Sequence, residues 1–192
     1  MSEKNAKLPY KESVGIMLIN RQGLVWVGRR LPKWQQDRSR HAWQMPQGGI
    51  YVGEKKRYAA LRELTEEVGT DNVELLAKSN ELYSYDLPDE LLGVALGGKY
   101  RGHRYKWFAM RFLGKDDEID ISDKGGYKAE FDDWQWVPID KIPELSFSFR
   151  RKLYEQIVNE FRRFATPIIA KKKRKRFPAW IRKVGSTILR SH

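Results

Sequence analysis

The stretch that decides the fold begins at Gly48, ends at Thr70 and reads GGIYVGEKKRYAALRELTEEVGT. Its second half, residues 55–68, predicts a helix. Apolar residues recur there at helical spacing on one face: Ala60, Leu61, Leu64 and Val68. Gly69 stands where a helix-ending glycine is expected. The Gly48-Gly49 pair at the front lets backbone N–H groups approach a phosphate.

Three carboxylates share one face of this predicted helix. Glu63, Glu66 and Glu67 stand at positions i, i+3 and i+4. Like charges at this spacing repel by about a few tenths of a kcal/mol. Mg²⁺ offsets such repulsion, because it takes oxygen ligands and keeps waters and substrate phosphates in its shell. Arg62 and Glu54 are candidates to orient these carboxylates. For these residues taken alone, a solvated acidic helix face is the alternative.

The rest of the chain alternates strand-like and helix-like segments. Strands are predicted at 14–19, 24–27, 43–52, 73–85, 105–113 and 134–137, a second helix at 148–164, and loops at 31–42 and 87–100. The first two strands predict a hairpin with Gly23 in its turn. Strands with helices between and after them indicate a mixed α/β layer fold.

Composition limits the class of protein. The 192 residues suit one domain with an appendage, and the absence of cysteine excludes disulfides, thiolate metal sites and a cysteine nucleophile. The N-terminus lacks a secretory signal, and no segment approaches the roughly 18 apolar residues of a transmembrane helix. We therefore expect a cytoplasmic protein without a transmembrane segment.

The basic charge is concentrated at the C-terminus. Residues 162–192 hold eleven Lys and Arg and no Asp or Glu, which accounts for most of the net charge of +12. We expect a catalytic domain at 1–164 and a basic tail at 165–192. Trp180, Val184 and Ile188 are four residues apart, which suits a short amphipathic helix on RNA or an anionic membrane surface. A disordered solubilising tail is the alternative.

The stretch at 48–70 resembles the Nudix box. The matching positions are Gly48, Glu54, Arg62, Glu63, Leu64, Glu66, Glu67 and Gly69, and Thr70 replaces an apolar residue. Neighbouring segments resemble bacterial RNA pyrophosphohydrolases, also known as dinucleoside polyphosphate hydrolases. These segments are WQMPQGG at 43–49, KWF at 106–108, EFD at 130–132 and SFRR at 148–151. The similarity covers about residues 10–161.

The resemblance implies a fold, a reaction and a set of site residues. The fold is an α/β/α sandwich around a mixed β-sheet, and the reaction is metal-assisted cleavage of a pyrophosphate bond. The implied metal ligands are Glu63, Glu66, Glu67 and Glu130, with Mg²⁺ as the cofactor and Mn²⁺ as a substitute. Arg62, Glu66 and Glu67 are the implied catalytic residues. Glu67 is favoured over Glu66 as the base.

The resemblance also implies a substrate side. The residues matched to substrate binding are Arg30, Gln47, Gly48, Gly49, Lys106, Phe149 and Arg150. A Phe beside a cation suits base stacking and phosphate contact, although core packing of Phe149 is an equal alternative. The chain departs from the family at Lys11, where Arg is usual, and at His103 and Tyr105, where glutamines are usual. His103 and His41 are interpreted as surface or loop residues that bind no metal.

Three functions stay open. The first is removal of pyrophosphate or phosphate from the 5′ end of triphosphorylated or diphosphorylated RNA. The second is hydrolysis of diadenosine polyphosphates or other small nucleotides by the same site. The third is a Nudix-fold RNA-binding module without turnover, which the complete set of box carboxylates disfavours. A monomer is expected.

Overall fold

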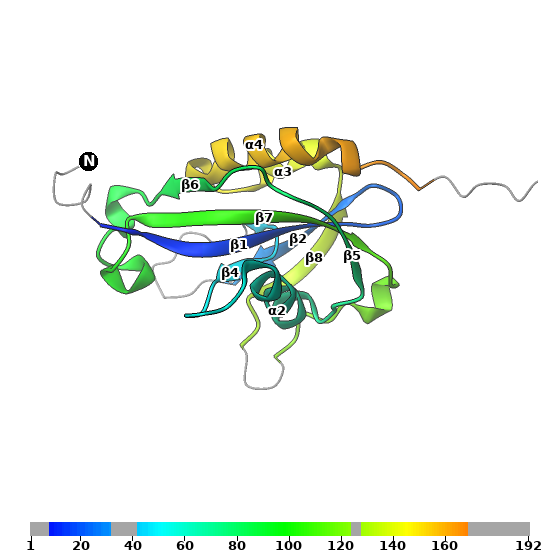
Figure 1. Cartoon of the computed structure of the whole chain (residues 1–192), viewed down its shortest axis with the longest axis horizontal. Helices are drawn as coiled ribbons and strands as arrows, with labels where there is room; N and C mark the ends of the chain where they lie inside the picture. Colours follow the sequence, from blue (N-terminus) through cyan, green and yellow to red (C-terminus); the bar gives the residue numbers. More distant parts are fainter. Residues whose placement is uncertain (1–7, 32–41, 124–127, 169–192) are drawn as a thin grey trace, which may run out of the picture.

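The computed structural model describes residues 8–31, 42–123 and 128–168. A mixed β-sheet is covered by helices on both of its faces (Figure 1). Helix α2 (Lys56–Val68) packs on one face, and α3 (Ile142–Leu145) and α4 (Arg151–Phe161) pack on the other. This arrangement confirms the predicted α/β/α sandwich.

Eight strands build the sheet. They are β1 (Tyr10–Ile19), β2 (Val25–Arg30), β3 (Trp43–Gln44), β4 (Gln47–Gly49), β5 (Val73–Lys78), β6 (Tyr83–Asp86), β7 (Gly102–Phe112) and β8 (Phe131–Val137). The main path runs β3-β2-β1-β7-β5, with β4 on β1, β6 on β7 and β8 on β2. Strands β1 and β7 are parallel and the other pairs are antiparallel, so the sheet is mixed.

Strand β1 lies inside the sheet and contributes to both cores. Val14, Ile16 and Leu18 pack with α2, whereas Met17 and Ile19 pack with α4. Burial on both faces explains why this strand reads as a continuous apolar run and does not alternate. The predicted hairpin of the first two strands is confirmed by the antiparallel pairing of β1 with β2.

Helix α2 matches its sequence prediction closely. Gly69 ends it at φ 80°, in the left-handed region, and its N–H donates to the carbonyl of Thr65 at 3.1 Å. Leu64 and Val68 are fully buried on the sheet side, while Leu61 is only partly buried. The carboxylates of Glu63 and Glu67 are buried on the face that turns toward β4.

The strand predicted at 73–85 is in fact two strands, β5 and β6. They are separated at Ser79, whose hydroxyl donates to the carbonyl of Glu81 at 2.8 Å and accepts from the N–H of Trp107 at 3.1 Å. A side chain therefore replaces a backbone partner at this point, and the strand breaks. Both strands still pair with β7.

Other boundaries also differ from the predictions. The second helix is regular only over α4, with 3-10 turns at 148–150 and 162–164. Strands β7 and β8 begin three residues earlier than expected, and 3-10 turns occupy 89–91 and 95–98 of the expected loop. Within the described ranges, no helix is long and apolar enough to cross a membrane. Most of the 31–42 loop, together with His41 and tail residues 169–192, lies outside the described residues.

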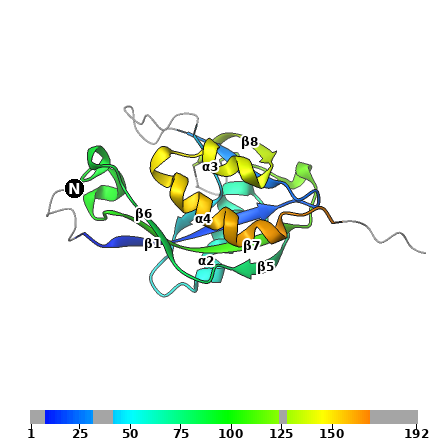
Figure 2. The ribbon, with the colours of Figure 1, turned by 90° about the horizontal axis from the view of Figure 1, so that it is seen from above.

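The described chain places two of its segments at opposite ends of the long axis. Residues 87–101 lie at one end, and the last described residues, after α4, lie at the other (Figures 1 and 2). The N–H of Ile168 donates to the carbonyl of Arg21 at 2.8 Å. The chain after α4 is therefore anchored beside the β1–β2 turn.

Candidate active site

Arg62 joins the carboxylates of α2 to the turn that precedes the helix. Its Nε and Nη2 donate to the two oxygens of Glu54 at 2.9 and 3.0 Å. Its Nη1 donates to Glu63 at 2.8 Å and to Glu66 at 3.3 Å. Nη2 also donates to the carbonyl of Gly49 at 2.8 Å. The bond to Glu54, followed by the contacts with Glu63 and Glu66, raises the pKa of Arg62, so this guanidinium stays charged.

Glu63 is a buried carboxylate in an anionic neighbourhood. Burial raises the pKa of Glu63, Arg62 opposes that shift, and the charges of Glu66 and Glu130 raise the pKa further. Glu130 comes from the segment before β8, far from α2 in sequence. Three carboxylates from two parts of the chain therefore act on one another electrostatically.

Two contacts bring α2 against β4. A Cβ atom placed on Gly48 would overlap the carboxylate of Glu63, so only glycine permits this approach. The N–H of Gln47 donates to Oε2 of Glu67 at 2.9 Å, inside the protein. These contacts set the positions of Glu63 and Glu67 relative to the glycine pair.

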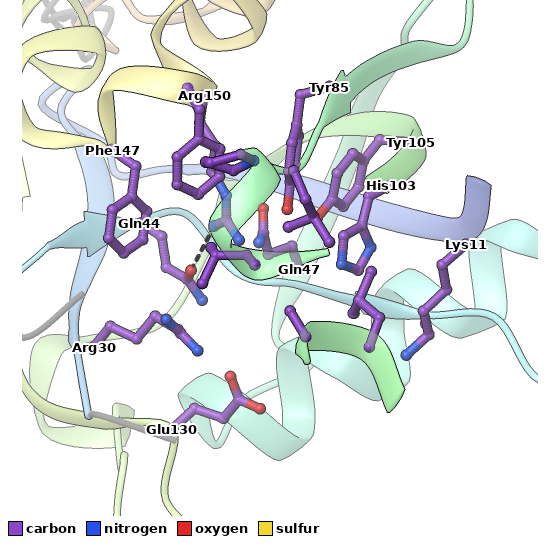
Figure 3. A pocket seen from close by; sticks show the side chains of 18 of the residues that line it. Lys11, Arg30, Gln44, Gln47, Tyr85, His103, Tyr105, Glu130, Phe147 and Arg150 are labelled. Carbon is purple, nitrogen blue, oxygen red and sulfur yellow. Dashed lines mark hydrogen bonds between the residues drawn. The ribbon is translucent and has the colours of Figure 1, made fainter. Parts of the chain in front are cut away.

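A cavity of about 1080 Å³ opens beside this cluster. Figure 3 shows Glu130 and Arg30 along one side, Tyr85 and Arg150 along the opposite side, and Lys11 toward one end. Gly48, Gly49 and Glu63 line it as well. The same space therefore meets carboxylates, a glycine turn and several cations.

Arg150 occupies the wall opposite Glu130. Its Nη1 donates to Oε1 of Gln44 at 2.8 Å, drawn as a dashed line in Figure 3. Its guanidinium carbon lies 5.0, 5.3 and 5.7 Å from the ring centroids of Tyr85, Phe147 and Phe149. In the described part of the chain, its buried Nε has no hydrogen-bond partner and no carboxylate pairs with it. The guanidinium thus lies among aromatic rings at the edge of the cavity.

His103 lines this cavity and is only partly buried, so it is a surface residue of the site and not a loop residue. It lies on β7, stacks on Tyr105 at 5.2 Å between ring centroids, and its Nδ1 is 2.8 Å from Oγ of Ser13. His103, Tyr105 and Trp107 stand at every second position of the strand. That period of two is the sequence signal that places His103 and Tyr105 on one face of the strand.

Most of the residues predicted for the substrate side line the cavity together. They are Arg30, Gln47, Gly48, Gly49, Phe149 and Arg150. Lys106 does not, and its Nζ donates instead to the carbonyl of Asn80 at 3.3 Å. The physical reason is strand alternation, because Tyr105 and Trp107 face the cavity side and turn Lys106 to the other face. Sequence reasoning missed Tyr85, Phe147 and the apolar wall from Leu87 to Leu96.

The donor set of the site fits a hard divalent cation, because Glu63, Glu66, Glu67 and Glu130 offer only carboxylate oxygens. Among the described residues, no three acidic or histidine side chains form a ready metal cluster. Arg62 binds oxygens of both Glu63 and Glu66 in this structure. The four-glutamate metal site stays a prediction.

Comparisons with known proteins show the family of this chain. The model of the NUDIX domain matches residues 9–157. RNA pyrophosphohydrolase of Brucella abortus is 51% identical over 161 residues, which cover 82% of this chain and 90% of the relative. The protein of the same name from Brucella anthropi is 51% identical over 158 residues, which cover 81% and 91%.

Solved structures show the same fold at low sequence identity. Dihydroneopterin triphosphate pyrophosphohydrolase of E. coli has a TM-score of 0.57 at 21% identity, covering 79% of this chain and 98% of its own. An Ap4A hydrolase of C. elegans has a TM-score of 0.56 at 15% identity, covering 80% and 96%. The match of the domain model over most of the chain, and relatives that are half identical, show that the chain belongs to the Nudix hydrolase family, whose members typically depend on divalent metals.

Proposed function

We propose that the protein is an RNA pyrophosphohydrolase, which removes pyrophosphate or phosphate from the 5′ end of triphosphorylated or diphosphorylated RNA. One observation carries this proposal. A single cavity joins the carboxylates Glu63 and Glu130 to a wall where Arg150 lies among aromatic rings. The first wall suits a phosphate chain bound with a cation, and the second suits bases and their phosphates. The name of the Brucella relatives supports the same substrate.

The catalytic end is proposed to hold Mg²⁺, or Mn²⁺ in its place, with Glu63, Glu66, Glu67 and Glu130 as ligands. When bound, such a cation polarises phosphate oxygens, lowers the pKa of the attacking water and offsets the charge of the leaving pyrophosphate. Glu67 is the proposed base, and it takes the proton of the attacking water. The N–H of Gln47 on its Oε2 holds this carboxylate in one orientation.

Arg62 is a positioning residue in this mechanism. Its guanidinium holds Glu63 and Glu66 side by side although their charges repel. It also holds the carbonyl of Gly49, so the glycine turn keeps a constant distance from the carboxylates. Because phosphoryl chemistry depends mainly on placement and charge, a fixed arrangement of this kind accounts for much of the expected acceleration.

The substrate end is proposed to bind through Arg30, Gln47, Gly48, Gly49, Phe149 and Arg150. The aromatic rings around Arg150 offer stacking surfaces, and its guanidinium offers a positive charge. Lys106 is not part of this set, because it does not line the cavity. Lys11 lines the cavity in its place, as a cation that meets a phosphate without the fork of an arginine.

A comparison of substrates tests the proposal. The values of kcat/KM are measured with Mg²⁺ on triphosphorylated RNA and on diadenosine polyphosphates. We expect the RNA to be preferred. If the small nucleotides are preferred by orders of magnitude, the protein is a dinucleoside polyphosphate hydrolase. If neither substrate is turned over, it is a binding module.

The tail is proposed to add a contact with RNA or an anionic membrane that is not sequence-specific, and a monomer in the cytoplasm is proposed for the whole protein. A truncation that tests the tail should begin at residue 169, because Ile168 is bonded to the β1–β2 turn. The salt dependence of RNA binding should become weaker in the truncated protein. An unchanged salt dependence removes the tail from RNA binding.

A further inference from the structure

The stretch from the end of β4 into the first turn of α2 carries large aromatic side chains on the surface. Tyr51 is 59% exposed and Tyr58 is 61% exposed, and Val52 between them is fully exposed. Lys55 and Lys56, which precede Tyr58, are exposed too. We call Tyr51, Lys55, Lys56 and Tyr58 the tyrosine–lysine ridge. The Nudix chemistry described above gives none of these four residues a role.

Tyr51 connects the ridge to the active site. It lines the cavity, and its ring centroid lies 4.0 Å from the guanidinium carbon of Arg62. Arg62 is itself fixed by its paired bonds to Glu54. The Tyr51 ring is therefore supported from one side by an immobile cation, while more than half of its surface faces solvent. A ring held in this way is ready to stack on a base without a large loss of side-chain entropy.

Tyr58 and Lys55 extend this surface along α2. Tyr58 stands four residues before Arg62, so the two side chains share one face of the helix. Lys55 is at the N-terminal boundary of the same helix. The ridge thus continues from the cavity mouth onto the exposed first turn of α2, without an intervening buried residue at 51–58.

The charge of the ridge is positive. Glu54 is paired with Arg62, and Glu12 is bonded at 2.6 Å to Nε of Arg104, so its 3.9 Å approach to Lys56 is a weaker contact. Among the described residues, no carboxylate lies within ion-pair distance of Lys55. Lys11 continues the positive charge into the cavity, where its side chain lies beside Gly49.

We propose that the tyrosine–lysine ridge binds single-stranded RNA downstream of the nucleotides held in the cavity, an inference that rests on the proposed function. Bases stack on Tyr51 and Tyr58, and phosphates meet Lys55 and Lys56. Interleaved aromatic and basic side chains on an exposed surface are the chemistry of single-strand binding. A protein partner fits less well, because lysines are depleted in protein–protein interfaces.

A dependence on RNA length follows from this geometry. Under this proposal, the cavity of about 1080 Å³ binds a dinucleotide with a 5′ triphosphate, whereas a longer RNA also contacts the ridge. The ridge therefore favours RNA over small nucleotides through residues that take no part in the chemistry. Part of the substrate preference then lies outside the cavity.

The test uses the full-length protein and two RNA lengths. The ridge variants are Lys55→Gln/Lys56→Gln and Tyr58→Ser, and the matched control is Lys78→Gln/Lys115→Gln, two exposed lysines on β5 and after β7. Tyr51 is left intact because its substitution would disturb Arg62. The values of kcat/KM are measured on triphosphorylated RNAs of two and of fifteen nucleotides at several salt concentrations.

For each ridge variant, we expect kcat/KM on the longer RNA to fall by about fivefold or more, which corresponds to the loss of one stacked base or two phosphate contacts. The dinucleotide should be cleaved within about twofold of wild type, and the control should change neither. The lysine variant should also lower the salt slope for the long RNA by about 1.4, at about 0.7 per phosphate contact. An equal fall on both lengths, or no change on either, overturns the proposal.

The same measurements distinguish a wrong ridge proposal from a wrong proposed function. If wild-type protein cleaves both RNAs efficiently but the ridge variants equal the control, only the ridge proposal is wrong. If wild-type protein prefers diadenosine polyphosphates over both RNAs, the proposed function is wrong, and the ridge proposal falls with it.

Discussion

Two arginines of the site are held in opposite ways: Arg62 lies behind the carboxylates, and Arg150 lines the cavity. Arg62 bonds to the carboxylates of Glu54, Glu63 and Glu66. Arg150 bonds to the neutral amide of Gln44 and lies among rings, and no carboxylate of the described chain pairs with it. Both guanidiniums are largely withdrawn from water, although Arg150 is buried more completely.

The difference shows which part of the site is complete before substrate arrives. A buried charge costs free energy unless it is paired and hydrogen-bonded. Arg62 meets that condition within the protein, so it acts as a fixed support for the carboxylates. Arg150 has a hydrogen bond to Gln44 but no paired carboxylate in the described chain. An anionic or carbonyl-rich group of the substrate can therefore pair with its charge. The comparison predicts that substitutions at the two ends affect different kinetic constants.

The largest effect is expected at the carboxylates that Arg62 supports. Glu67→Gln keeps the shape of the side chain but removes its charge and its basicity, so kcat should fall by about a thousandfold. In Glu66→Gln, kcat should fall by a similar factor. Thermal unfolding and circular dichroism should match wild type, and Glu155→Gln on the exposed face of α4 should keep full activity. Unchanged turnover in both site variants would contradict the assignment of metal and base.

A smaller but distinct effect is expected at Arg62. Arg62→Met leaves Glu63 and Glu66 facing each other without their shared cation. We expect kcat to fall by about 10–100-fold, as for other residues that orient metal ligands, while KM changes little. In metal-free protein the free energy of unfolding should fall by about 1–3 kcal/mol. Added Mg²⁺ should restore part of this loss, and the absence of any restoration would separate Arg62 from the metal site.

Arg150→Met should give the opposite pattern. The substitution removes a buried charge that no carboxylate of the described chain neutralises and replaces it with an apolar chain of similar length. The loss of the hydrogen bond to buried Gln44 opposes this gain, so the free energy of unfolding should change by less than about 1 kcal/mol. KM for RNA should rise about tenfold or more, while kcat stays within a few-fold, because the lost contact binds substrate before and during reaction. A fall in kcat with constant KM would remove the contrast between the two arginines.

The two ends of the cavity also differ in how far the sequence predicts them. The Arg62 end depends on helix spacing and one glycine turn, both of which are local. The spacing of Glu63, Glu66 and Glu67 predicts a shared face, and Gly69 predicts the end of the helix, as the structure confirms. Contacts of this kind lie within about twenty residues of one another, so pattern alone places them.

The Arg150 end depends on long-range pairing. Tyr85 reaches Arg150 only because the strand predicted at 73–85 breaks at Ser79 and β6 then pairs with β7. Nothing in the local pattern predicts that break. The side of the sheet on which Lys106 lies depends likewise on which residues of β7 pack against α4. That packing is a tertiary contact, which local sequence does not predict. The resemblance to the family predicts Phe149 and Arg150 as site residues. For His103 and Tyr105, the only sequence signal is their alternation along β7.

A matched pair of glycines tests how closely α2 must approach β4. Gly48→Ala would place a methyl group on the Glu63 carboxylate, whereas in Gly49→Ala the nearest atom is Cε of the flexible Lys11 side chain, 3.0 Å away. Gly48→Ala should lower the free energy of unfolding by about 1–3 kcal/mol, with activity falling about tenfold. Gly49→Ala should have the smaller effect in both measurements. Equal effects would show that the turn, and not the carboxylate, requires glycine.

The smallest effect is expected at the ion pair that supports the Arg150 end from behind. Asp86 follows Tyr85 on β6 and accepts from Nε of Arg101 and from the hydroxyl of Tyr10, both at 2.8 Å. Burial alone would raise the pKa of Asp86, but these bonds lower it below its usual value of 3.8. A lowered pKa means that the folded state holds this proton less tightly than the unfolded chain does. The contribution to stability is therefore present above about pH 4 and is lost as the pH falls through the lowered pKa.

Asp86→Asn isolates that contribution. The free energies of unfolding of wild type and variant, measured in urea at pH 7, should differ by less than about 1 kcal/mol. The Asp86 side chain is partly exposed, so water screens its charge from Arg101. The difference should be the same at pH 5 and should shrink toward pH 3. KM for RNA should change less than in Arg150→Met, since Asp86 does not line the cavity. If instead KM rises as much as in Arg150→Met, the Asp86–Arg101 pair fixes the position of Tyr85 beside Arg150. Arg150 would then be positioned by an ion pair of the protein, as Arg62 is.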